Sequence, residues 1–412
     1  MHKRPLLPLF LTIFIDMLGV GIVIPVLAAV FLNETSGALP VDTPLAQRTF
    51  LYGLLLSTYP FAQFFGAPIL GALSDYRGRK PILLISLLGT ALGYILFGIG
   101  IVEQSLPILF ASRFLDGFTG GNISIAMSAI ADISDRDSKS KNFGLIGAAF
   151  GLGFILGPFI GGELSNAELV SWFSLSTPFF ATGFLTLINI LLCMFFLPET
   201  IKRKVHTRIS LMTGFRQVGK AFTTPSVRTM FTVVFLLALG FNFFTQFFPV
   251  FLIERFAFTE TNTGRLFAYV GVWIALTQGL ATRALASRFT PEAIIRLTTL
   301  GLGMVLLALI VPTTGATFYY LMPFVAVCQG LLTPNATTVI SNLAGEDAQG
   351  EIMGINQSVQ SFAQMIPPVI AGLLSGINLE LPLILAGGFT LCGWALFMWA
   401  YNTPKREEIV HA

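Results

Sequence analysis

The chain has 412 residues, of which 54% are hydrophobic and only 11% are charged. Soluble domains usually carry about 25% charged residues, so this composition excludes an ordinary soluble protein and favours one that lies in lipid. The net charge is +3, and the basic residues behind it cluster at the predicted ends of apolar segments, so the charge pattern does not indicate a nucleic-acid partner.

Long apolar segments follow one another along the whole chain. A bilayer requires about 20 apolar residues for each spanning helix, and the sequence predicts an all-α integral membrane protein with twelve such helices. The predicted spans are 6–32, 51–73, 81–102, 106–131, 142–164, 173–197, 228–252, 264–285, 291–312, 316–343, 351–376 and 380–402. The first span contains Asp16 and continues past Pro25, which favours a retained helix over a cleaved signal peptide.

The basic residues predict the orientation of these helices. If the N-terminus is cytoplasmic, only Arg48, Arg255 and Arg265 fall on the outer side of the membrane. The positive-inside rule then places both termini in the cytoplasm.

The longest cytoplasmic connection, 198–227, is rich in Lys and Arg and is predicted to link two halves of the chain. A short amphipathic helix on the membrane surface is expected within it, at 211–222. The predicted domains are an N-terminal six-helix bundle at 1–197, the cytoplasmic linker at 198–227 and a C-terminal six-helix bundle at 228–412.

The two halves share an internal repeat. The fourth and fifth predicted helices recur as the tenth and eleventh at a constant offset, which aligns Phe114 with Phe324, Gly120 with Gly330, Ala126 with Ala336, Gly144 with Gly354, Pro158 with Pro368, Gly162 with Gly372 and Ser165 with Ser375. Such repetition is typical of transporters in which two pseudo-symmetric bundles rock about a site near the membrane midplane.

Three charged residues, Asp16, Arg113 and Asp116, are the candidates for charges held within the membrane, away from the ends of their predicted spans. Because a charge at the bilayer centre costs at least about 2.5 kcal/mol, such residues usually line a cavity and have a function. We expect Asp16 or Asp116 to take up a proton from outside while Arg113 modulates its affinity. The alternative is that Arg113 and Asp116, three residues apart, simply neutralise each other.

Polar side chains in other spans are candidates for a substrate pocket between the halves. They are Tyr59, Gln63, Asn122, Asn242, Gln246, Gln278, Asn356 and Gln360. For any one amide, a hydrogen bond between helices is an equal alternative. Forty phenylalanines and few intramembrane charges favour a lipophilic, planar or weakly basic substrate over a phosphate or dicarboxylate.

Two motifs resemble those of a known family. The segment Gly71-Ala-Leu-Ser-Asp75-Tyr-Arg77-Gly78-Arg79-Lys80 is similar to the loop signature of the major facilitator superfamily, and with Asp132 it implies a cytoplasmic latch. In it, Gly71 is expected to permit a close helix contact and Gly78 a tight turn. A second motif, whose key residues are Gly153, Gly157, Pro158, Gly161 and Gly162, resembles the antiporter motif of the same superfamily and implies a hinge and export by exchange.

Together with Asp16, Tyr59, Gln63 and Arg113, these motifs resemble the tetracycline-efflux type of drug:proton antiporter. The resemblance implies a monomer in the bacterial inner membrane that exchanges protons for small molecules among membrane lipids, without a cofactor. The alternatives are export or uptake of an endogenous metabolite on the same fold and, less favoured, a membrane receptor that does not transport.

The histidines bear on two further expectations. All three, His2, His206 and His411, are predicted outside the membrane. Tetracycline pumps of this type use a histidine in a helix of the C-terminal half, so the sequence leaves open whether tetracycline is a substrate. The spans also lack a metal-ligand cluster and a Ser or Cys with a His partner, which argues against an enzyme.

Overall fold

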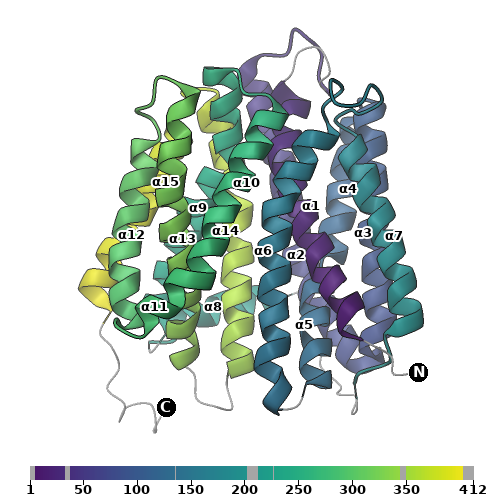
Figure 1. The fold of residues 1–412 in the computed structure, drawn as a ribbon, viewed down its shortest axis with the longest axis vertical. Helices are drawn as coiled ribbons and strands as arrows, with labels where there is room; N and C mark the ends of the chain where they lie inside the picture. The colour runs from purple at the N-terminus through teal and green to yellow at the C-terminus, as the bar shows by residue number, and fades with distance from the viewer. Residues whose placement is uncertain are drawn as a thin grey trace. The chain divides into compact units, whose positions relative to one another are not determined.

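The described part of the chain is helical and contains no strand (Figure 1). The computed structural model describes residues 5–32, 38–134, 136–201, 212–225, 227–343 and 349–401, without the side chains at 136–141, 143–145, 283, 286 and 349–351. The long helices are α1 (Leu6–Leu32), α2 (Leu45–Arg77), α3 (Arg79–Val102), α4 (Leu106–Thr119), α5 (Asn122–Ile133), α6 (Arg136–Leu164), α7 (Thr177–Phe196), α9 (Arg228–Phe256), α10 (Glu260–Leu276), α12 (Pro291–Ala308), α13 (Phe318–Asn342), α14 (Gln349–Ser375) and α15 (Leu381–Ala400). The short ones are α8 (Thr213–Thr223), the π-helix η1 (Thr277–Ala281), α11 (Thr282–Ala286) and the 3-10 helix η2 (Gly315–Thr317).

Within the described residues, eight helical segments are long and apolar enough to cross a membrane. They lie in α1, α3, α6, α7, α9, α12, α13 and α15. Large apolar side chains also cover outer surfaces; Leu297 and Trp399, for example, are 74% and 88% exposed. Lipid is the solvent that suits such a surface, so the chain is a multi-pass membrane protein. The count of twelve spans stays a prediction.

The predicted single helix at 106–131 is wrong, because the structure divides it into α4 and α5 at Gly120 and Gly121. A break inside a membrane is tolerated where a neighbouring side chain satisfies the freed backbone groups. Here Gln63 of α2 donates its Nε2–H to the carbonyl of Gly120 at 2.9 Å. That hydrogen bond comes from another helix, so local sequence did not reveal it.

The predicted single helix at 264–285 is also interrupted, by the π-helix η1 between α10 and α11. Such a widened turn leaves backbone carbonyls without their usual partners. The hydroxyl of Thr282 donates to the carbonyl of Thr277, five residues earlier, at 3.2 Å. Side-chain hydroxyls therefore help to stabilise the irregular turn.

The chain forms two compact units. Unit 1 comprises Met1–Thr213 and Ala257–Ala268, and unit 2 comprises Gly214–Phe256 and Tyr269–Ala412. The linker helix α8 thus belongs to unit 2, while the start of α10 belongs to unit 1.

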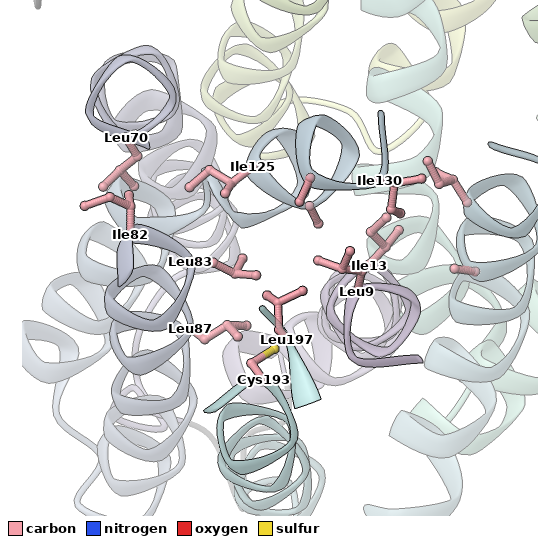
Figure 2. Packing of buried hydrophobic residues seen from close by; sticks show 14 residues of the cluster. Leu9, Ile13, Leu70, Ile82, Leu83, Leu87, Ile125, Ile130, Cys193 and Leu197 are labelled. Atoms are coloured by element: carbon pink, nitrogen blue, oxygen red, sulfur yellow. The ribbon is translucent and has the colours of Figure 1, made fainter. Parts of the chain in front are cut away.

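Unit 1 has an apolar core at the end where α2 meets α3. Side chains converge there from α1, α2, α3, α5 and the end of α7, as Figure 2 shows. They include Leu9, Ile13, Leu70, Ile82, Leu83, Leu87, Ile125, Ile130, Cys193 and Leu197. Lipid tails are as apolar as these residues, so close packing is what stabilises the core. This core fixes the ends of the helices that carry the latch motif.

Unit 2 is built around the phenylalanine-rich helix α9. Phe243, Phe244, Phe247 and Phe248 are all almost fully buried, so these rings pack inside the unit and do not face lipid. Gly240 lets α9 approach α15 closely, since an added Cβ would lie 2.6 Å from the carbonyl oxygen of Ala386.

The amphipathic helix predicted at 211–222 is present as α8. Its apolar face, Gly214, Val218 and Ala221, is buried, and Gln217 accepts a hydrogen bond from Ser358 of α14 at 2.5 Å. One face of α8 is therefore packed against unit 2. The basic linker residues from 202 to 211 and the three histidines lie outside the described residues.

Candidate functional site

The three predicted intramembrane charges are all buried within unit 1. Asp16 on α1 is 6% exposed, and Arg113 and Asp116 on α4 are 4% and 2% exposed. Ionised groups in such surroundings cost several kcal/mol unless they are paired or hydrogen-bonded. The partners of each group therefore determine what it can do.

The carboxyl group of Asp16 has one satisfied oxygen. Its Oδ1 accepts a hydrogen bond from Nδ2 of Asn122 at 2.6 Å, whereas Oδ2 is buried without a hydrogen-bond partner among the described residues. Asn122 is the first residue of α5, so the interruption between α4 and α5 sets where this amide lies. A carboxyl group with one free oxygen has a position at which it can hold a proton.

Arg113 and Asp116 are paired only loosely. The distance from Nη1 of Arg113 to Oδ2 of Asp116 is 3.6 Å, which is longer than a hydrogen bond. Nε and Nη2 of Arg113 have no hydrogen-bond partner among the described residues. Instead, the guanidinium lies over the ring of Phe97, with its carbon 4.2 Å from the ring centre. This geometry weakens the alternative that the two charges merely neutralise each other.

Polar side chains of α2 and α3 lie close to these charges. Nε2 of Gln63 donates to the hydroxyl of Tyr59 at 3.3 Å as well as to the carbonyl of Gly120. The hydroxyl of Tyr94, which sequence reasoning missed, lies against Gly19, where an added Cβ would be 1.6 Å from Oη. A larger residue at Gly19 would require the side chain of Tyr94 to move.

The predicted polar residues of unit 2 form separate groups. On α9, Nε2 of Gln246 donates to Oδ1 of Asn242 at 3.0 Å, and Asn242 donates to its own helix. Asn356 of α14 is buried, and its Oδ1 has no hydrogen-bond partner among the described residues. Gln360 is half-buried on the same helix, and Gln278 is exposed in η1. That these residues face those of unit 1 across a pocket stays a prediction.

Arg79 is the centre of the latch motif. It pairs with Asp75 at 2.6 Å and with Asp132 at 3.2 Å, and it donates to the hydroxyl of Ser74 at 2.7 Å. Gly78 joins α2 to α3 with a φ of 122°, a conformation that side chains disfavour. The motif therefore fixes the turn and links α2 to the end of α5.

One residue of the latch motif, Gly71, differs from expectation. Gly71 was expected at a close helix contact, but an added Cβ would meet no described atom within 4 Å. Arg77 is exposed. Sequence reasoning also missed Glu199, whose carboxylate accepts hydrogen bonds from the backbone N–H groups of Arg79 and Lys80 at 2.8 and 3.3 Å. Glu199 thus caps α3, whose N-terminus favours negative charge.

The antiporter motif on α6 packs closely against α1. An added Cβ would lie 2.5 Å from the Cβ of Met17 at Gly153, 2.6 Å from the carbonyl oxygen of Leu18 at Gly157, and 3.0 Å from the Cα of Ile22 at Gly161. The glycines therefore let the two helix backbones touch.

The other side of the motif contacts the first part of α10, which also belongs to unit 1. A Cβ added at Gly264 would lie 2.3 Å from the carbonyl oxygen of Pro158. Thr261 donates its hydroxyl hydrogen to the carbonyl of Gly162 at 3.1 Å, and Arg265 pairs with Glu163 at 2.7 Å. The motif therefore packs against α1 on one side and against the first part of α10 on the other.

Gly157→Ala is expected to destabilise the protein by about 1 to 3 kcal/mol, because the new methyl group would press on the α1 backbone. The matched control is Gly151→Ala on the same helix, where an added Cβ meets no described atom within 4 Å. Thermal unfolding in detergent measures both variants. Equal melting temperatures for the two would contradict the close contact.

An all-helical membrane protein that holds ionisable side chains between its helices has the features of a membrane transporter. The family model described as Major Facilitator Superfamily matches residues 9–368 and again 298–411. The chain belongs to the major facilitator superfamily, and it is accordingly a transport protein and not an enzyme.

Relatives of known type cover nearly the whole chain. The class E tetracycline resistance protein of Escherichia coli is 32% identical over 92% of this chain and 89% of its own. The quinolone resistance protein NorA of Staphylococcus aureus is 28% identical over 95% of each chain. The crystal structure of the human organic anion transporter MFSD10 superposes with a TM-score of 0.71 at 22% identity, covering 96% of this chain and 99% of that one.

Proposed function

We propose that the protein is a proton-coupled antiporter that exports small amphiphilic or lipophilic compounds by alternating access. It works as a monomer among the lipids of the bacterial cytoplasmic membrane, with both termini in the cytoplasm. Its twelve spans form two pseudo-symmetric six-helix bundles, and the substrate binds between them.

The main support for the proposal is the burial and incomplete hydrogen bonding of the Asp16 carboxyl group. A carboxyl group that is 6% exposed, with one hydrogen bond and one oxygen free, is costly as a structural element of a membrane helix. Such a group is retained when gaining and losing a proton is its function. Arg113 supplies a positive charge beside Asp116 without forming a close pair with it.

The proposed cycle uses the two buried carboxyl groups, Asp16 and Asp116, as proton acceptors. A proton enters from the outer side and binds Asp16 or Asp116, and the substrate leaves the same cavity. In the inward-open state the proton departs to the cytoplasm and a new substrate binds. The membrane potential contributes about 2.3 kcal/mol per charge per 100 mV to the inward movement of the proton.

The substrate class rests on two observations. The relatives include proteins named for resistance to tetracyclines and quinolones, which are compact amphiphilic compounds. Arg48 and Arg113 are the buried basic residues of the described α1 to α7, and Arg48 already donates hydrogen bonds to the backbone carbonyls of Phe31 and Pro40. A dianionic substrate usually requires several available basic groups. A lipophilic, planar or weakly basic compound fits these surroundings.

The test is a susceptibility panel of tetracycline, norfloxacin and ethidium on cells with and without the protein, followed by uptake of each compound into inside-out membrane vesicles. We expect increased tolerance to at least one compound and uptake that requires an acidic vesicle interior. Absence of both effects for every compound would refute drug export. Uptake without dependence on the pH gradient would refute proton coupling.

A further inference from the structure

The surroundings of Arg113 are aromatic. Its guanidinium carbon lies 4.2 Å from the ring centre of Phe97, 5.9 Å from that of Tyr94 and 6.0 Å from that of Phe179. Phe97 and Phe179 are fully buried, and their ring centres are 4.4 Å apart. α3 supplies Tyr94 and Phe97, and α7 supplies Phe179. These three rings form an aromatic cage around the cation.

Ring faces surround the guanidinium of Arg113 at positions where hydrogen-bond acceptors would be expected. A cation within about 6 Å of a ring centre is attracted by the negative face of the ring, and the attraction grows when water is excluded. Nε and Nη2 of Arg113 have no hydrogen-bond partner among the described residues. Phe97, whose ring is the nearest of the three, therefore acts together with the carboxylate of Asp116 to offset the burial of this guanidinium.

Asp116, on the same helix, is placed to form a close ion pair with Arg113. Asp116 follows at a spacing of three, at which arginine and a carboxylate can pair closely through two hydrogen bonds. The structure shows 3.6 Å instead, and Oδ2 of Asp116 is buried without a hydrogen-bond partner among the described residues. The two charges are thus neighbours that stop short of a close pair.

We propose that Phe97 is a positioning residue for proton coupling. Its ring holds the guanidinium of Arg113 away from a close pair with Asp116, so that the neighbouring carboxyl groups can still take up a proton. The inference rests on the proposed proton-coupled function and adds to it an uncharged residue that acts through Arg113.

The other ionisable groups around Arg113 come from several helices. In the described part of the chain they are Asp116 on α4, Tyr94 on α3, Tyr59 on α2 and Asp16 on α1. α7 contributes Phe179 and has no charged residue in its sequence. A shift of Arg113 toward Asp116 would therefore change the charge balance around both carboxyl groups.

The test compares Phe97→Leu, which removes the ring face, with Phe97→Tyr, which retains it. Phe31→Leu is the matched control, because Phe31 is also fully buried in unit 1 but packs edge-on against Tyr52. Uptake of tetracycline, norfloxacin and ethidium into inside-out vesicles is measured against interior pH, and counterflow without a gradient shows that each variant is folded. If Phe97→Leu does not fold, Phe97→Met replaces it.

We expect Phe97→Leu to move half-maximal uptake to a lower interior pH by about one unit, because a tighter Arg113–Asp116 pair opposes proton binding. Counterflow should persist, and Phe97→Tyr and Phe31→Leu should keep the wild-type profile. A wild-type profile in a folded Phe97→Leu variant, or an equal shift in Phe31→Leu, would overturn this inference alone. Uptake that lacks pH dependence in the wild type would instead overturn the proposed function.

Discussion

Replacing Asp16 by asparagine is expected to abolish uptake driven by a pH gradient in inside-out vesicles, reducing it to the rate of vesicles without the protein. Asparagine has nearly the same shape, and its Oδ1 can still accept the hydrogen bond from Asn122. The side chain can no longer exchange a proton, so only coupling should be lost. Counterflow, in which labelled substrate exchanges with unlabelled substrate, should persist.

The control for this variant is Asp42→Asn, which makes the same chemical change at an exposed residue before α2. It should leave both uptake and counterflow at the wild-type rate. Asp116→Asn is measured in parallel, since either acid is a candidate proton carrier. Gradient-driven uptake that persisted in Asp16→Asn would contradict the role expected of Asp16, and persistence in both variants would contradict the proposed role of either acid.

Arg113→Met is expected to lower stability by about 1 to 3 kcal/mol and to block transport. The substitution leaves Asp116, which is 2% exposed, without its nearest positive charge. Because the two charged groups are 3.6 Å apart, the expected loss of stability is smaller than for a tight buried ion pair. Thermal unfolding in detergent and vesicle uptake measure the two effects separately.

The double variant Arg113→Met with Asp116→Leu distinguishes a structural pair from a functional one. Removing both charges should restore most of the lost stability, since no buried charge of the pair is left without a partner. Transport should remain blocked if Arg113 takes part in coupling. Wild-type transport in the double variant would show that the two residues only neutralise each other.

Much of the fold follows from hydropathy alone. Apart from 106–131 and 264–285, the predicted spans coincide with long helices, because a bilayer admits few other backbone conformations. The interruption at Gly120 and Gly121 did not follow, since the hydrogen bond that permits it comes from Gln63 on another helix. Helix breaks of this kind depend on tertiary contacts that a local pattern does not contain.

The candidate site was predicted more completely for charged residues than for their neighbours. Asp16 and Arg113 stand out because charge is rare in a span, and Asp75 and Arg79 because they lie in a recognisable motif. Phe97 and Tyr94 look like ordinary packing residues among forty phenylalanines and eight tyrosines. Glu199 looks like a surface acid until the turn at Gly78 brings the N-terminus of α3 to it.

The most direct test of proton exchange measures protons and substrate together. Inside-out vesicles are made acidic inside, and a pH-sensitive dye reports interior pH while a panel compound that the wild type exports is added outside. We predict that wild-type vesicles lose interior acidity as the compound enters, and that vesicles with Asp16→Asn do not. Entry of the compound without proton movement, or with protons moving in the same direction, would contradict exchange.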